Sequence, residues 1–335
     1  MMARWKRPLY GVGAVPPSEA QRRCVFFVCA NRDGVLTPVG TCFLVSLPIE
    51  GGVARYFVTA GHIVRGEAPR WIRFRRADGG THDELAEEWV TLPPGSDGVP
   101  EVDIAATPCE FDPGDEYIMF WQEEEYFSDK WPPGVTVDLG ARAYFMGLLA
   151  DVPHMADRAI PMMRAAAVGA LNTEDVPVRD RYGDGTEYTR REPCAHLIDT
   201  YSRSGFSGAP VYVEHQLVVL ANPAAGQLFV EQSGFTALFG VLVGHFGSPG
   251  DNAGVAVVVP IEAVRQLLNQ PKLVEWREGK AVEMKENQEE RLDESAAQLD
   301  SLPESESEFE RFERLTGKLV RVPKKELDEK RREDG

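Results

Sequence analysis

A chain of 335 residues can bury the core of one large β-structure or of two small domains. Its formal net charge of −17 excludes a broad phosphate-binding surface, so we expect no nucleic-acid partner. The sequence has no apolar run long enough to cross a bilayer, and we therefore expect no membrane partner.

The first segment, residues 1–20, is expected to be a loose leader. It contains basic residues but lacks the apolar stretch of a signal peptide. The five cysteines are an odd number, and they are scattered along the chain. We expect them to be reduced and largely buried, which favours a cytoplasmic location.

Short apolar segments with turn residues between them follow the leader, and this spacing predicts a β-sandwich or a β-barrel. The expected strands of the first half are 24–30, 41–46, 56–59, 71–75, 89–92 and 102–106. The expected strands of the second half are 141–149, 163–171, 237–246 and 254–259. Residues 112–133 are rich in aromatic and acidic side chains, and they are expected to connect the two sets.

Three further segments are assigned from their composition. The polar segment 172–192 is expected to be an exposed loop, and residues 260–269 are expected to form a helix because a proline precedes one apolar face. From about Lys272 charged residues dominate, so the tail should not hold a core alone.

An apolar stripe interrupts this charged tail. It predicts a short amphipathic helix, which we interpret as a contact for a regulatory partner or for self-docking. The alternative is a surface helix without a function. The stripe consists of Phe309, Phe312, Leu315 and Leu319.

A serine lies in a glycine-rich stretch, Ser204-Gly205-Phe206-Ser207-Gly208-Ala209-Pro210, directly before the apolar run Val211-Tyr212-Val213. Glycine adopts positive φ without a Cβ clash, so such a turn can present the hydroxyl of Ser207. It can also leave backbone N–H groups beside that hydroxyl. A nucleophilic serine needs both features.

A histidine and an aspartate follow apolar strand patterns earlier in the chain. The segment 56–64 is a short apolar strand that ends in small residues and His62. The segment 102–106 places Asp103 against an apolar run. A buried aspartate needs a hydrogen-bonding partner, and the N–H of an imidazole is a suitable one.

In this order, the three segments resemble the motifs of the chymotrypsin/trypsin-like serine peptidases. Thr59-Ala60-Gly61-His62 is similar to the family's histidine segment, and Asp103-Ile104-Ala105 is similar to its aspartate segment. The serine stretch resembles Gly-x-Ser-Gly-(Gly/Ala)-Pro, and Thr41-Cys42-Phe43-Leu44-Val45 resembles the strand before the histidine. The resemblance covers residues 24–268. It implies an all-β, two-barrel fold with a short C-terminal helix and a charged, partly disordered tail.

The resemblance also implies the domain organisation. His62 and Asp103 would belong to the first barrel, and Ser207 would belong to the second. The expected parts are the leader 1–20, a first β-barrel 21–125, a second β-barrel with its closing helix 126–271, and a charged tail 272–335 with its short amphipathic helix.

As the resemblance implies, the chain would be a serine endopeptidase that acts on protein or peptide substrates through an acyl-enzyme. Ser207 would be the nucleophile, His62 the general base and Asp103 the residue that orients it. The N–H groups of Gly205 and Ser207 would form the oxyanion hole. No metal is expected, because no histidine pair has metal-ligand spacing with a third ligand, and no cofactor is expected either.

The resemblance places the substrate pocket near Tyr201, Gly244, His245 and Gly254, and we expect a neutral, small or apolar residue before the scissile bond. The animal digestive enzymes of the family have an aspartate where this chain has Phe206, so activation by an inserted N-terminus is not expected.

Two alternatives have different functions. One is a non-catalytic binding or scaffold module on the same fold. The other is an esterase, but esterases normally use the α/β-hydrolase order Ser, Asp, His, and the order here is different.

Overall fold

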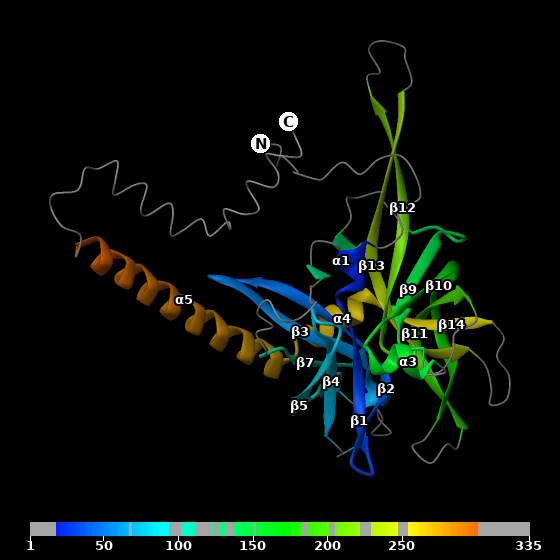
Figure 1. Ribbon diagram of the computed structural model, residues 1–335. Helices are drawn as coiled ribbons and strands as arrows, with labels where there is room; N and C mark the ends of the chain where they lie inside the picture. Colours follow the sequence, from blue (N-terminus) through cyan, green and yellow to red (C-terminus); the bar gives the residue numbers. More distant parts are fainter. Residues whose placement is uncertain are drawn as a thin grey trace, which may run out of the picture. The chain divides into compact units, whose positions relative to one another are not determined.

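The computed structural model describes residues 18–66, 69–93, 102–110, 122–123, 127–130, 137–149, 152–181, 187–200, 205–221, 229–246 and 254–300. Two β-structures follow one another in this part of the chain, first an eight-stranded sheet and then a closed six-stranded barrel (Figure 1). An all-β, two-barrel fold with a short helix after the second barrel was expected. The all-β fold, its two β-structures and the helix are confirmed, and among the described strands the second structure closes into a barrel whereas the first forms a sheet.

The N-terminal sheet has the strand order β5-β4-β1-β2-β3-β7-β6, and β8 pairs with β2 in parallel. A tight turn joins β1 to β2, and Asp33 and Gly34 there adopt φ of 53° and 85°. Positive φ at both positions matches the twist of the flanking strands. The strands are β1 (Val25–Arg32), β2 (Val35–Ile49), β3 (Gly52–Ala60), β4 (Arg70–Arg75), β5 (Thr81–Ala86), β6 (Val90–Thr91), β7 (Ile104–Pro108) and β8 (Gln122–Glu123).

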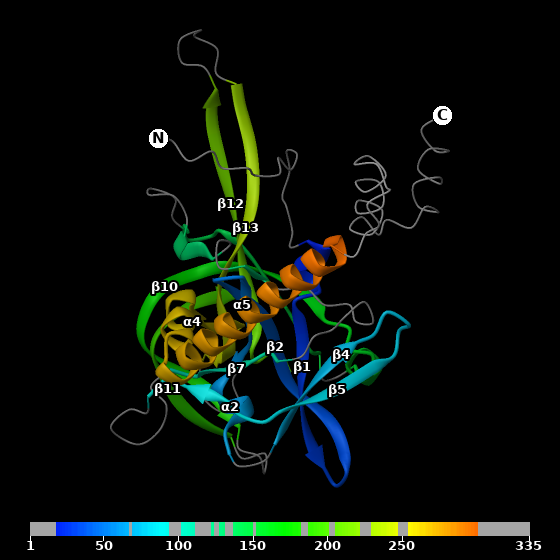
Figure 2. The same ribbon diagram turned by 90° about the vertical axis from the view of Figure 1, so that its left-hand side faces the viewer.

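The C-terminal barrel closes in the order β10-β11-β14-β13-β12-β9. Two of its strands, β12 and β13, continue beyond the barrel as a two-stranded hairpin, as both views show (Figures 1 and 2). The strands are β9 (Arg142–Gly147), β10 (Met162–Arg181), β11 (Glu187–Asp199), β12 (Ala209–Ala221), β13 (Phe229–Phe246) and β14 (Val255–Pro260).

The polar segment 172–192 is not an exposed loop, contrary to our expectation. Its described residues extend β10 and β11, in which Val176 pairs with Glu192 and Val178 pairs with Arg190. All four residues are buried. In a strand only alternate side chains face inward. Two inward valines can therefore pack β10 into the core, although charged residues precede and follow them.

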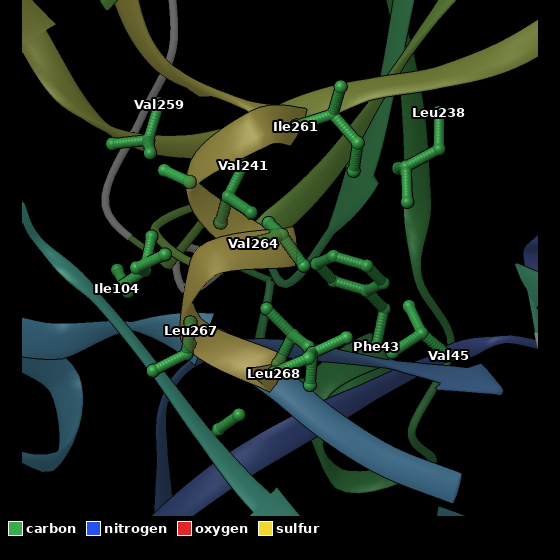
Figure 3. Packing of buried hydrophobic residues seen from close by; sticks show 14 of the residues in the cluster. Phe43, Val45, Ile104, Leu238, Val241, Val259, Ile261, Val264, Leu267 and Leu268 are labelled. Carbon is green, nitrogen blue, oxygen red and sulfur yellow. The ribbon is translucent and has the colours of Figure 1, made fainter. Parts of the chain in front are cut away.

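The core between the two β-structures is closed by helix α4 (Ile261–Leu268), which confirms the expected helix. Figure 3 shows Val264 and Leu268 of this helix beside Phe43 of β2, and the same cluster contains Val241 of β13. Residues from both β-structures therefore share one apolar core. The shorter helices are α1 (Glu19–Arg22), α2 (Gly61–Val64), the 3₁₀ helix η2 (Ser128–Lys130) and α3 (Pro153–Asp157).

A long helix, α5 (Pro271–Asp300), begins the charged tail, and we did not predict it. Near its start Leu273 is buried, and the ring of Trp276 lies edge-on to Tyr56 at 5.2 Å. The chain divides into two compact units, Met1–Val282 and Glu283–Gly335. Among the described helices, none has both the length and the apolarity that a membrane crossing requires. The apolar stripe 309–319 lies outside the described residues.

Candidate active site

The register of two neighbouring strands places His62 beside Asp103. Ala60, the last residue of β3, pairs with Ile104, the first residue of β7. Asp103 precedes that pair and His62 follows it by two positions, at the first turn of α2. The backbone N–H of Gly61 also donates to the carbonyl of Asp103 at 3.1 Å. Strand pairing alone therefore brings the two predicted residues to the same sheet edge.

Asp103 holds the imidazole of His62 through both of its carboxylate oxygens. His62 Nδ1 lies 2.6 Å from Oδ2, and the backbone N–H of His62 donates to Oδ1 at 2.8 Å. The side chain of Asp103 is 2% exposed and that of His62 is 13% exposed. A carboxylate at Nδ1 requires the proton on that nitrogen, so Nε2 is left as the basic atom.

Three positively charged or hydrogen-bonding groups keep Asp103 ionised. Burial alone raises the pKa of this carboxyl, but the charge of Arg190, the hydrogen bond with His62 and the charge of Arg65 outweigh burial. The pKa of Asp103 consequently lies well below its usual range. Arg190 Nη2 is 2.8 Å from Oδ2, and Arg65 Nη2 is 3.2 Å from Oδ1.

The loop that carries Ser207 has two positions whose backbone conformation favours glycine. Gly205 and Gly208 adopt φ of 101° and 87°. A Cβ on Gly208 would lie 1.9 Å from the carbonyl oxygen of Thr41, which is far inside contact distance. The Gly208 N–H donates to the carbonyl of Leu242 at 2.7 Å. The loop is thus tied both to β13 and to the N-terminal sheet.

Two buried threonines fix the serine loop against the strands that lead to His62. The N–H of Thr41 donates to the carbonyl of Ser207 at 2.9 Å, and its hydroxyl donates to the carbonyl of Gly205 at 2.8 Å. The hydroxyl of Thr59 donates to the carbonyl of Thr41 at 2.6 Å. Since Thr59 is three residues before His62, these bonds place the loop at the same edge as the histidine.

The environment of Ser207 agrees with a presented hydroxyl. Ser207 is half-buried, whereas the preceding Phe206 is fully buried with its ring edge-on to Phe145 at 5.1 Å. Within the described residues, the N–H groups of Gly205 and Ser207 have no hydrogen-bond acceptor. Phe206 therefore anchors the loop by apolar packing.

Three of the four predicted pocket residues lie at the end of β13 and the start of β14. A Cβ on Gly244 would meet Val178 Cγ1 at 2.7 Å, and the carbonyl of Gly254 accepts the N–H of Thr200 at 2.8 Å. His245 is partly buried beside Arg179, its partner in the register of β10, and burial followed by that charge lowers its pKa. Tyr201 lies outside the described residues.

A cavity of about 790 Å³ opens elsewhere, at the outer strands of the N-terminal sheet. Neither His62, Asp103 nor Ser207 lines it. Its lining combines apolar and acidic side chains, among them Phe57, Trp276, Glu84, Glu88 and Glu110. The cavity is therefore separate from the candidate site.

Our sequence reasoning missed the charged residues behind Asp103. Arg190 and Glu192 belong to the segment that we assigned to an exposed loop, yet their side chains are 7% and 1% exposed. The available signal was the alternation of Val176 and Val178 four residues into that segment, which is typical of a strand with one buried face. Thr41 was used only as part of a motif, and its role in holding the serine loop was not predicted.

No family model matches the chain, and no curated protein matches it. Several solved structures resemble it at low identity. The protease Anisep from Arthrobacter nicotinovorans is 13% identical over 75% of this chain and 96% of its own, with a TM-score of 0.41. A thermostable serine protease, AL20, from an extremophilic microorganism is 12% identical over 75% and 97%, with a TM-score of 0.39. Human heparin binding protein is 11% identical over 78% and 97%, with a TM-score of 0.41.

Proposed function

We propose that this chain is a serine endopeptidase that cleaves peptide bonds in protein or peptide substrates. The observation that carries the proposal is the contact of 2.6 Å between His62 Nδ1 and the buried, ionised Asp103. It supports the tautomer with its proton on Nδ1, in which Nε2 can accept a proton. The serine loop is tied to the adjoining strand end, which supports Ser207 as the group that gives up this proton.

In the proposed reaction, Ser207 Oγ forms a bond to the carbonyl carbon of the substrate while its proton passes to His62 Nε2. The carbonyl π electrons move onto oxygen and then return, which breaks the C–N bond. The leaving amine takes the proton from His62, and an acyl-enzyme remains. Water then attacks the acyl carbon while its proton passes to His62. The bond to Ser207 Oγ breaks, Oγ takes the proton back, and the carboxylic acid product leaves. Asp103 stabilises the imidazolium in both halves.

The proposed oxyanion hole consists of the N–H groups of Gly205 and Ser207. The N–H of Ala209 donates to the carbonyl of Phe206 at 2.9 Å, and this carbonyl shares a peptide unit with the N–H of Ser207, so the bond supports a fixed orientation of that donor. Donors that are already oriented stabilise the developing charge without reorganisation, and each is worth about 10²–10³ in rate.

The substrate pocket is proposed at Tyr201, Gly244, His245 and Gly254. Two of these residues are glycines, so the described part of the pocket wall is largely backbone. Burial lowers the pKa of His245, which favours its neutral form near pH 7. Both features support a neutral residue before the scissile bond.

A reducing, cytoplasmic location is also proposed. All five cysteines are free thiols, and four of them are buried. Burial raises the pKa of the Cys29 thiol to about 12 and that of Cys42 well above its usual value. Thiols of this kind are structural and react poorly, which supports a protein that forms no disulfides.

Labelling of the purified full-length chain with a fluorophosphonate tests the proposed function. The wild-type protein should react at neutral pH, and Ser207→Ala and His62→Ala should each abolish the reaction. His82→Ala is the matched control, because His82 is a half-exposed histidine that pairs with Glu84 on β5. A folded wild-type protein that stays unlabelled, beside a peptidase that labels, would favour the non-catalytic binding module.

A further inference from the structure

Two buried charged residues that approach Asp103, Arg190 and Glu192, belong to the C-terminal barrel and not to the sheet that carries Asp103. Arg190 lies on β11 of the C-terminal barrel, whereas Asp103 precedes β7 of the N-terminal sheet. The Arg190 guanidinium is 2.8 Å from Asp103 Oδ2, the same oxygen that faces His62 Nδ1. It is therefore a direct link between the barrel and the His62–Asp103 pair.

We propose that Arg190 is a positioning residue of the site: its buried guanidinium, held by Glu192 and by the carbonyl of Val243, fixes the Asp103 carboxylate against His62. This inference rests on the proposed peptidase function, which assigns His62 and Asp103 to catalysis. Arg190 acts through Asp103 and would not itself touch the substrate.

The barrel holds the guanidinium from two strands. Arg190 Nη1 donates to Glu192 Oε1, and Nη2 donates to the carbonyl of Val243 at 3.0 Å. Glu192 is fully buried, and its second oxygen lies 3.5 Å from the backbone N of Asp103. A planar guanidinium with a fixed fork of donors can make these contacts at once, whereas an ammonium cannot reproduce the fork.

Within the part of the chain that the structure describes, the charges around Asp103 balance. Arg65, Arg190 and Glu192 are the charged groups that the described contacts place around Asp103 and His62. Two carboxylates and two guanidinium groups cancel when His62 is neutral. Arg190 and Arg65 differ in burial, because their side chains are 7% and 35% exposed. They also contact different oxygens of Asp103, so Arg65 is a natural comparison for Arg190.

Two consequences follow if Arg190 positions Asp103. Loss of its fork should let the carboxylate turn away from the imidazole, and small displacements of a catalytic group cost about 10² in rate. A carboxylate that has turned away also stabilises the protonated imidazole less. The acid side of the pH–rate profile should then move to lower pH when Arg190 is removed together with Glu192, since that pair carries no net charge.

The test compares variants of the full-length chain by their rate of fluorophosphonate labelling at several pH values. Arg190→Met leaves Glu192 buried without its partner and could unfold the protein, so the main variant is Arg190→Met/Glu192→Met. This double variant removes one charge of each sign and fills the volume with apolar groups. Arg190→Lys keeps the charge without the fork, and Arg65→Met is the matched control.

We expect the double variant to label about 10²-fold more slowly at its optimal pH, with its acid limb at lower pH. Arg190→Lys should label at a rate between the double variant and the wild type. Arg65→Met should lose less than about fivefold, because the Arg65 side chain is 35% exposed and its interaction is weakened by solvent. If the double variant, or Arg190→Lys in case the double variant does not fold, labels as fast as the wild type with an unchanged acid limb, Arg190 is only structural and the inference is wrong.

A second readout separates this inference from the proposed function. In Ser207→Ala protein labelled with ¹⁵N-histidine, the ring signals of His62 report its protonation without any reaction. Adding Arg190→Met/Glu192→Met should move the midpoint of this titration to lower pH, because the net charge is kept while the Asp103 carboxylate turns away from the ring. Adding Arg65→Met removes one positive charge and should not move the midpoint to lower pH. An unchanged midpoint would contradict the inference. A wild-type protein that never labels would contradict the proposed function, while the midpoint still decides the role of Arg190.

Discussion

The two halves of the candidate site are held in place by different physical means. On the N-terminal sheet, charges and side-chain hydrogen bonds fix His62 and Asp103, with two oxygens of one carboxylate serving four donors. In the serine loop, backbone conformation and close contact do the same, through positive φ at Gly205 and Gly208 and the buried Thr41. Changes of charge should therefore affect activity most at His62 and Asp103, and changes of backbone conformation should affect it most in the serine loop.

This difference predicts which substitutions each half tolerates. At His62 and Asp103, activity should fall when a substitution keeps volume and shape but alters charge or hydrogen-bond direction. In the serine loop, activity should fall when a single methyl group is added. The following predictions test each expectation, beginning with the largest effect.

Asp103→Asn should lower turnover by roughly 10⁴ while the protein remains folded. The change keeps the shape of the side chain, but an amide N–H at Nδ1 would force the imidazole into the wrong tautomer. Steady-state cleavage of a peptide substrate and thermal unfolding are the two measurements. Asp83→Asn is the control, since Asp83 forms an ion pair with Arg73 on strands away from the site. Wild-type turnover in Asp103→Asn would show that another group orients His62.

Gly208→Ala should reduce the labelling of Ser207 by about 10²-fold or more, because the loop must move to make room. The added Cβ would lie 1.9 Å from the carbonyl oxygen of Thr41 and 2.4 Å from Thr59 Oγ1. Gly34→Ala is a matched control, since Gly34 has a similar φ of 85° but no atom within 4 Å of an added Cβ. It should lose only about 1 kcal/mol of stability.

Equal effects of the two alanine substitutions on labelling would contradict the account of the serine loop. The comparison separates close contact from backbone strain. An alanine would be strained by positive φ at both positions, but only the alanine at position 208 would also clash with its neighbours.

Acid should affect the second barrel before it affects the charged half of the site. His196 is buried, its ring is stacked on Phe239 at 4.2 Å, and burial lowers its pKa to about 4. An unfolded histidine takes up its proton near pH 6.5, so the unfolded state binds more protons between pH 6.5 and 4. Stability should fall as pH falls through this window, by about 3 kcal/mol in total.

Urea unfolding of the wild type and of His196→Phe at several pH values measures this slope. The variant should lose the part of the slope that His196 causes, although the N–H of Asn172 loses its acceptor and lowers stability at every pH. His82→Gln, at a half-exposed histidine, is the control and should keep the part of the slope that His196 causes. A slope that persists in His196→Phe would assign the acid sensitivity to other groups.

The parts of the site that could be predicted from the sequence are those with a strong local signal. His62 and Asp103 flank apolar strands whose pairing brings them together, and Ser207 lies among glycines that permit its turn. Short apolar segments also indicated the all-β fold. These features depend on a few neighbouring residues, which a single sequence displays directly.

The missed parts depend on contacts between distant segments. Arg190 and Glu192 are charged, and only the closed barrel and the opposing Asp103 explain why they are buried. Helix α5 was missed because charge suggested a solvated tail. Its abundant Glu, Lys, Ala and Leu residues favour a helix, and its start gains stability when Leu273 is buried in the core.

The most direct test of the central claim identifies the residue that a fluorophosphonate modifies. The account predicts one adduct per chain, located by mass spectrometry on the peptide that contains Ser207, and no adduct in His62→Ala. An adduct on a different residue, or the same Ser207 adduct at an unchanged rate in His62→Ala, would contradict the claim that His62 and Asp103 activate Ser207.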